Sequence, residues 1–173
     1  MPDFRPRDIH RPAIARATTL LLTGGLTIMA MASTATAHQN DPALTAVNPP
    51  GLFDPTPYGF SQAVIAPAGG RVAYISGQYG ADGTGALSPD FAAQVRQAFA
   101  NLRVALDGIG AEPGQVAMLT IYVVDHDPSK LGPVTAAVVE TFGTALPAQT
   151  LVPVPRLALD GMLFEVEAVA VLD

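Results

Sequence analysis

The segment QVAMLTIYVVD, residues 115–125, constrains the fold more than any other part of the sequence. Its residues are nearly all apolar, and many of them are β-branched or aromatic, which is typical of a β-strand. A strand with one solvated face alternates apolar and polar side chains, whereas this segment is almost continuously apolar. The segment therefore predicts a strand buried on both faces, so the protein must place a covering layer on each side of a sheet.

An amphipathic pattern before this strand predicts a helix. Ser88 is the expected N-cap, Pro89 suits the first helical position, and Asp90 complements the helix dipole. Gly108 and Gly110 are expected to end the helix. The residues of its apolar face are Phe91, Val95, Ala98, Leu102, Ala105 and Ile109.

Four further strands and a second helix complete the pattern. The strands are expected at residues 60–68, 70–80, 149–157 and 162–172, the first two joined by a turn at 68–70. The second helix is expected to begin near residues 127–129, to bend around Gly132 and Pro133, and to end at Phe142. This order predicts an α+β domain over residues 60–173, with two helices on one face of a mixed sheet.

The last strand raises the question of what covers the other face of that sheet. Apart from Glu165 and Glu167, its alternating positions are apolar on both sides. Such a surface is too apolar for a solvated monomer, so a closed homo-oligomer is the economical explanation. The alternative is that residues 38–59, which are rich in Pro, Gly and Asn and predict an extended arm, cover this face.

The first 37 residues have the pattern of a secretory signal peptide. Four arginines precede the apolar stretch TTLLLTGGLTIMAMA, which is too short to span a bilayer, and small residues follow at Ala35 to Ala37. An uncleaved anchor is the alternative, although two glycines in the stretch weaken a permanent membrane helix. Residues 38–173 are therefore expected to be exported, to the periplasm or beyond, and to have no membrane partner.

Charge and composition exclude several classes of partner and site. Residues 38–173 retain five of the nine basic and thirteen of the fifteen acidic residues, a net charge of −8. This balance disfavours nucleic acid and anionic lipid as partners. Cysteine is absent, which excludes disulfides, thiolate nucleophiles and cysteine-ligated metals. The DHD motif at 125–127 predicts a turn and N-cap rather than a metal site, and no motif indicates a cofactor.

Several motifs occur together in an order that resembles the RidA/YjgF family, the reactive intermediate deaminases. They are Ser-Gly-Gln at residues 76–78, Asn-Leu at 101–102, Pro-Ala at 147–148 and Glu-x-Glu-Ala-x-Ala at 165–170. The resemblance extends from about Tyr58 to Leu172. It implies a chorismate-mutase-like fold and a homotrimer whose three sheets line a central barrel, with small-molecule sites in the clefts between subunits.

The resemblance also implies a chemistry that needs no metal or cofactor. Active members of the family hydrolyse 2-imino acids and their enamine tautomers to 2-oxo acids and ammonia. An arginine in a Pro-Ala-Arg-Ser/Thr segment holds the substrate carboxylate, but here the corresponding residue is Gln149, an uncharged amide in an apolar strand. Losing the bidentate charged contact should weaken carboxylate binding by about two orders of magnitude.

The other site positions that the resemblance implies are present. Tyr58 corresponds to a tyrosine that lines the ligand, Ser76 and Gly77 to positions near the substrate nitrogen and carboxylate, and Glu165 to the glutamate that orients water. Leu151 stands where many members have cysteine. The candidate site therefore has Glu165 as its catalytic residue, and its ligand-binding residues are Gln149, Tyr58, Ser76, Gly77 and Thr150.

Two charged groups allow alternatives. Glu165 and Glu167 share strand parity and lie on one face, where they could shift a pKa for acid–base work or form a solvated pair at a rim. Arg156 lies an odd number of residues from Gln149, which places it on the opposite face of a straight strand. It is therefore expected to pair with an acid such as Asp160 instead of replacing the missing arginine.

Two functions from different classes fit these residues. The first is an exported RidA-like hydrolase that binds a small neutral or carbonyl-bearing ligand and releases ammonia from an imine, an enamine or a related compound. The second is a non-catalytic trimer that binds a ligand or protects against one. The arrangement of Gln149 and Glu165 discriminates them, because an active site needs both side chains in one cavity.

Overall fold

The computed structural model describes residues 44–172, so the predicted signal peptide and residues 38–43 lie outside the described residues. The elements within this range are β1 (Thr45–Val47), η1 (Thr56–Tyr58), β2 (Ala63–Ile65), β3 (Arg71–Tyr79), α1 (Phe91–Gly108), η2 (Pro113–Gln115), β4 (Val116–Val124), η3 (Pro128–Lys130), α2 (Leu131–Phe142), β5 (Ala148–Val154) and β6 (Phe164–Leu172).

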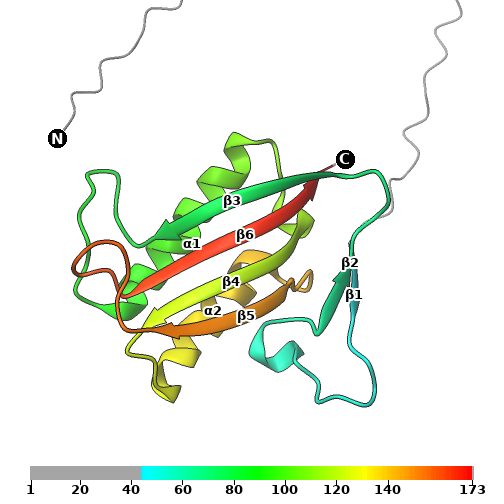
Figure 1. Cartoon of the computed structure of the whole chain (residues 1–173), viewed down its shortest axis with the longest axis horizontal. Helices are drawn as coiled ribbons and strands as arrows, with labels where there is room; N and C mark the ends of the chain where they lie inside the picture. The colour runs from blue at the N-terminus through cyan, green and yellow to red at the C-terminus, as the bar shows by residue number, and fades with distance from the viewer. Residues whose placement is uncertain (1–43, 173) are drawn as a thin grey trace, which may run out of the picture. The chain divides into compact units, whose positions relative to one another are not determined.

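The main sheet has the strand order β3-β6-β4-β5. Strand β6 is antiparallel to both β3 and β4, and β4 is parallel to β5. Both helices lie on one face of this sheet (Figure 1). The α+β architecture with a mixed sheet and two helices on one side is therefore confirmed.

Alternation along β4 shows how the sheet divides its two faces. Leu119, Ile121 and Val123 are fully buried against the helices, whereas Met118, Thr120 and Tyr122 on the outer face are only half-buried. The core on the helical side includes Val95, Phe99 and Leu102 of α1, Val134 and Val138 of α2, and Phe164, Val166 and Ala168 of β6. The described residues therefore supply one of the two covering layers that the apolar strand predicts.

The outer face is exposed at the β3 edge of the sheet. Tyr74 is 82% exposed and Val72 is 52% exposed, although both pair with apolar residues of β6. The described part of the arm, residues 44–59, leaves these two side chains exposed. It therefore does not cover the outer face at this edge, as one of the two explanations from the sequence required.

Helix α1 begins two residues later than expected, because Asp90 and not Ser88 is its N-cap. The Asp90 backbone is extended and its carboxylate accepts a hydrogen bond from the Ala93 amide at 2.7 Å. Ser88 lies upstream, where its hydroxyl accepts from the Asp90 amide. Within the helix, Asn101 donates to the carbonyl oxygens of Tyr79 and Ala81, which fixes α1 against the end of β3.

The predicted hairpin of residues 60–68 with 70–80 is wrong. Strand β2 pairs with β1 in a separate two-stranded sheet, and β3 pairs with β6. The physical reason is the anchoring of Ser61, whose amide donates to the Pro147 carbonyl and whose hydroxyl donates to the Leu146 carbonyl at 2.7 Å. These bonds hold the start of β2 beside β5, at the sheet edge opposite β3.

The second helical segment begins as the sequence predicts and differs in detail. The Asp127 carboxylate caps η3 by accepting from the Ser129 amide. The change from η3 to α2 occurs at Lys130 and Leu131, so Gly132 and Pro133 belong to the first turn of α2 instead of marking a bend. A proline is tolerated there because the first-turn amides have no helical acceptor. Strand β5 ends at Val154 rather than at residue 157.

Candidate functional site

An apolar pocket lies between the arm, α2 and β5. Its volume is about 520 Å³, which is within the range of small-molecule sites. The lining residues are Phe53, Tyr58, Phe60, Leu131, Val134, Thr135, Gln149 and Leu151. None of these described lining residues carries a charge. Gln149 contributes one amide, and the other seven residues contribute carbon surface and neutral hydroxyl groups.

Local hydrogen bonds place the arm over α2 and β5. Gly59 has a positive φ of 82°, a conformation that favours glycine, and it lies within contact distance of Thr135 and Val138 of α2. The Thr135 hydroxyl donates to the Tyr58 carbonyl at 3.3 Å, and Ser61 is bonded to the residues just before β5. Phe53 then contacts Tyr58 and Phe60 edge to face, with ring centroids 6.0 and 6.1 Å apart. These contacts build an aromatic wall beside Gln149.

Gln149 occupies the position where the sequence suggested a missing charge. It pairs with the fully buried Leu119 of β4, so its side chain lies on the helical side of the sheet. Its Oε1 atom is buried and accepts no hydrogen bond from the described residues. A buried amide oxygen without a donor costs about 1–3 kcal/mol, so a donor from outside the described residues would stabilise this side chain.

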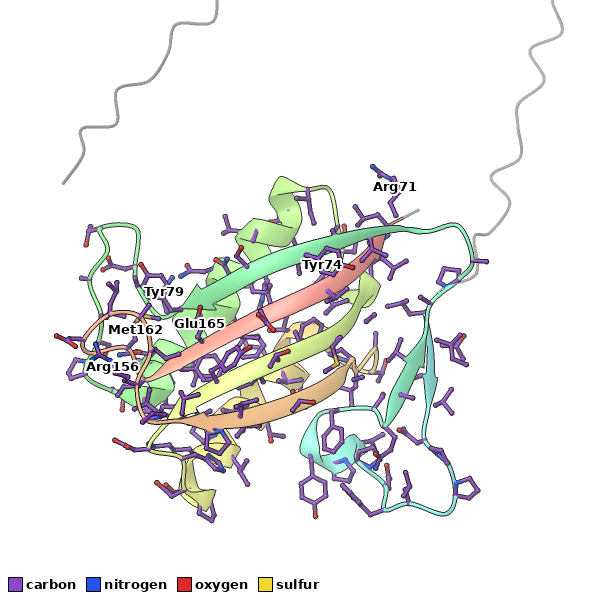
Figure 2. All side chains as sticks on the ribbon, viewed as in Figure 1. Arg71, Tyr74, Tyr79, Arg156, Met162 and Glu165 are labelled. Atoms are coloured by element: carbon purple, nitrogen blue, oxygen red, sulfur yellow. The ribbon has the colours of Figure 1, made fainter. Side chains whose placement is uncertain are left out.

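A second cluster lies on the outer face, around Glu165. This residue pairs with Tyr79 of β3 and Tyr122 of β4. Figure 2 shows Glu165 and Tyr79 at the same end of the sheet. A Cβ atom on Gly77 would lie 1.8 Å from Glu165 Oε1, so the glutamate side chain passes directly over this glycine. The β-bulge between Ile75 and Gln78 contains Ser76 and Gly77, and Gly77 lies next to the carboxyl group.

Burial and a neighbouring carboxylate shift the pKa values of two groups in this cluster, Glu165 and Tyr122. Burial, together with the nearby Glu167 carboxylate, raises the pKa of Glu165. The Tyr122 hydroxyl donates to Glu167 Oε1 at 3.2 Å, and burial followed by the Glu167 charge raises the pKa of Tyr122. A carboxylate with a raised pKa is a better general base near neutral pH than an ordinary one.

The predicted site residues thus fall into two groups on opposite faces. Tyr58 and Gln149 meet in the pocket on the helical side. Gly77 and Glu165 meet on the outer face, and Ser76 precedes Gly77 in the bulge. Thr150 also lies on the outer face, paired with Thr120. Gln149 and Glu165 therefore do not share a cavity within one chain.

Sequence reasoning missed several residues of both groups. Phe53, Phe60 and Thr135 complete the pocket, and Tyr122 completes the acidic cluster. The closely spaced aromatic residues at 53, 58 and 60 were a signal of clustering, because a segment so rich in Pro and Gly has little other reason to carry them. The contacts of Thr135 and Tyr122 depend on tertiary structure, so no local pattern indicates them.

Replacing Gly77 by alanine should displace the Glu165 side chain with little loss of stability. The clash is with the flexible end of that side chain, which can move toward solvent. Its pKa should then fall toward the ordinary glutamate value, because burial is the main cause of the rise. Carbon-13 NMR titration of the glutamate carboxyls measures the shift. Gly83→Ala is the matched control, because a Cβ there meets nothing within 4 Å; an unchanged Glu165 titration in Gly77→Ala would contradict the close approach.

Replacing Glu167 by glutamine should lower the pKa of Glu165, because it removes the second cause of the rise and leaves burial. In the native protein the folded state binds more protons than the unfolded state between the ordinary and the raised pKa, so the Glu165 contribution to the free energy of unfolding falls as pH rises through that interval. The variant should show a smaller fall. Chemical denaturation across the acidic pH range, compared with the native protein, measures the difference; identical pH profiles would argue against coupling of the two carboxylates.

The other charged candidates have structural roles. Arg156 forms an ion pair with Asp160 at 3.5 Å, as the sequence predicts, and both side chains are exposed. Lys130 donates to the carbonyl oxygens of Val124 and Asp125, next to the turn that Asp127 caps. Within residues 44–172 no three potential ligands gather for a metal ion, and no helix has the length and hydropathy of a membrane span.

Comparisons with known proteins agree on one family. Residues 54–172 match the family described as Endoribonuclease L-PSP. The sequence is 32% identical to a 2-iminobutanoate/2-iminopropanoate deaminase of Salmonella typhimurium over 59% of this chain and 80% of that protein. It is 33% identical to a RutC family protein of Pyrococcus abyssi over 67% of this chain and 89% of that protein. The fold is similar to the crystal structure of the Rid-family protein YyfB of Yersinia pestis, with a TM-score of 0.71, 35% identity, and coverage of 75% of this chain and 99% of that one.

Proposed function

This chain belongs to the RidA/YjgF family, also described as Endoribonuclease L-PSP, and on that basis we propose that it is an exported hydrolase of imines or enamines. Its active site is formed between subunits of a homotrimer with a central barrel. The similarity to a deaminase of two 2-imino acids supports the imine class of substrate. The observation that carries the proposal is the placement of two features on one sheet. Glu165, a carboxylate with a raised pKa, lies on the outer face, and the pocket lies on the helical face.

The need for a second subunit follows from the placement of the two groups. The described lining of the pocket with Tyr58 and Gln149 has no acid or base, and Glu165 and Gly77 do not belong to that lining. A neighbouring copy that covers the exposed outer face would bring its pocket to the Glu165 cluster and bury Tyr74 and Val72. Each site would then combine the pocket of one copy with the carboxylate of another.

The reaction uses water and the residues of this cluster. The Glu165 carboxylate accepts a proton from water as the water oxygen bonds to the imine carbon, and the carboxyl group then gives that proton to the imine nitrogen. In the resulting carbinolamine, the carboxylate takes the hydroxyl proton and passes it to the amine nitrogen as the carbon–nitrogen bond breaks. This releases a carbonyl compound and ammonia and restores the carboxylate. Lowering the pH through the raised pKa of Glu165 protonates the base, so the rate should fall there.

Ammonia release tests the activity. The protein of residues 38–173 is mixed with an amine oxidase, which generates neutral imines, or with an amino acid oxidase, which generates 2-imino acids. We expect ammonia to appear faster than by spontaneous hydrolysis with native protein, and at the spontaneous rate with Glu165→Gln. A native rate equal to the spontaneous rate for both imine classes would instead support the non-catalytic alternative, a trimeric binding or protective protein, which the missing arginine favours.

Mixed oligomers test the intersubunit site. Gln149→Leu damages the pocket and Glu165→Gln damages the carboxylate, so each pure variant should be impaired. When the two variants are unfolded together and refolded, about a quarter of the sites in a random trimer combine two intact halves, and activity should return to that level. If Gln149 and Glu165 served one site within a chain, mixing would restore nothing.

RNA is not proposed as a substrate, although the family description names an endoribonuclease. Residues 38–173 carry a net charge of −8, which repels a phosphate backbone, and the pocket offers no described cation to a phosphate.

A further inference from the structure

The pocket on the helical side has an apolar lining and one amide side chain, that of Gln149. We propose that it binds a neutral molecule that combines an aromatic or aliphatic body with a carboxamide- or lactam-like group, and that it discriminates against carboxylates. This inference rests on the proposed function, because it names the class of ligand that enters the same site.

The lining defines the apolar part of the ligand. Phe53, Tyr58 and Phe60 form one wall, and Leu131, Val134 and Leu151 contribute aliphatic surface. The Phe53 ring contacts the rings of Tyr58 and Phe60 edge to face, and all three residues line the pocket. A ligand body without charge can therefore transfer most of its surface from water to carbon contacts.

Gln149 defines the polar part. Its Oε1 is buried without a hydrogen-bond partner, and its amide is the one strongly polar side-chain group of the described lining apart from the hydroxyls of Tyr58 and Thr135. A primary amide offers one acceptor and two donors, and rotation about its last bond exchanges the oxygen and nitrogen positions. A carboxamide or lactam matches this set, because it donates an N–H to the glutamine oxygen and accepts from the glutamine nitrogen.

A carboxylate does not match. It has no proton to donate, so Oε1 would stay unpaired, and it would bring a full charge into a pocket whose described lining has no cation. Lys130, which precedes Leu131 in the sequence, donates its hydrogen bonds to the Val124 and Asp125 carbonyls instead. The pocket should therefore prefer the amide over the acid of the same shape.

Matched pairs of small probes test the preference directly. Phenylacetamide and phenylacetate have the same body and differ only in the polar group, and their binding to the protein of residues 38–173 is measured by NMR chemical-shift titration at pH 7. We expect the amide to bind at least about tenfold more tightly, which is the effect of one satisfied hydrogen bond to an otherwise unpaired group. Equal binding of the two probes, or tighter binding of phenylacetate, would overturn the proposal.

Variants assign the preference to the amide of Gln149. Gln149→Leu should lose the preference for phenylacetamide while still binding the apolar body, and Gln149→Arg should reverse the preference toward phenylacetate. Gln97→Leu is the matched control, because Gln97 bonds only to Asn101 on α1 and does not line the pocket. A preference that survives in Gln149→Leu would also overturn the assignment.

The same measurements separate this inference from the proposed function. Binding is scored without turnover, so it is measured independently of imine hydrolysis. Amide preference without any imine hydrolysis would uphold the inference and remove the hydrolase. Rapid hydrolysis of 2-imino acids together with carboxylate preference would uphold the hydrolase and remove the inference.

Discussion

Replacing Gln149 by arginine is expected to raise kcat/KM for 2-imino acids by about two orders of magnitude. A guanidinium at this position would present two parallel N–H groups and a positive charge to the substrate carboxylate, whereas the native amide offers neither the charge nor the second contact. Gln149 lines a pocket of about 520 Å³, into which the longer side chain can extend. The rate of 2-oxo acid release from imino acids generated by an amino acid oxidase measures the gain.

Two further variants control this experiment. Gln149→Lys supplies the charge without the two parallel N–H groups and should give a smaller gain in kcat/KM. Gln149→Met supplies neither and should give no gain. Neutral imines should not benefit from the arginine. A native rate that already equals that of the arginine variant would show that the carboxylate is held elsewhere. A folded arginine variant without any gain would show that the rest of the site does not support the reaction.

Replacing Gln94 by leucine is expected to lower the free energy of unfolding by about 3–5 kcal/mol, the sum of several unpaired buried groups. Gln94 is fully buried in α1. Its Nε2 donates to the carbonyl oxygens of Ser88 and Gly161 at 2.7 Å, and its Oε1 accepts from the Leu163 amide at 2.8 Å. Leucine has a similar volume and bonds none of them. Urea denaturation followed by circular dichroism measures the loss.

Gln97→Leu provides the comparison, because it lies on the same helix and loses only a bond to Asn101. It should cost less than about 0.5 kcal/mol, as is usual for pairs along a helix. A loss in Gln94→Leu no larger than in Gln97→Leu would mean that the three backbone groups find other partners. Gln94 joins α1 to the segment before β6, so its replacement should also make the start of β6, where Glu165 lies, less rigid.

The elements with strong local patterns were predictable. The apolar run of β4, the amphipathic face of α1 and the N-cap at Asp127 all depend on residues close together in the sequence. The expected hairpin of residues 60–68 with 70–80 failed because Ser61 is held by carbonyl oxygens 85 or more residues away, beside β5. A long-range anchor of this kind leaves no periodicity in the local sequence.

The residues of the candidate site also divide into those that the sequence indicated and those that only tertiary contacts bring together. The sequence identified Gln149 as an uncharged residue where a carboxylate-binding arginine was expected, and it identified Glu165 as an acid near Glu167. It also predicted the pairing of Arg156 with Asp160, because that contact is local. It did not indicate the aromatic wall or the bond from Tyr122 to Glu167, since both join separate elements.

The sequence by itself determined the residue chemistry, the two helices and the strands of the main sheet, and the family resemblance, because these depend on side-chain type and local spacing. Only the tertiary structure decided which side chains meet. Gln149 pairs with Leu119 and Glu165 pairs with Tyr122, and these two positions on β4 have opposite parity. The register between strands therefore places the amide and the carboxylate on opposite faces of one sheet. That separation is the physical reason for expecting a site shared between copies of the chain.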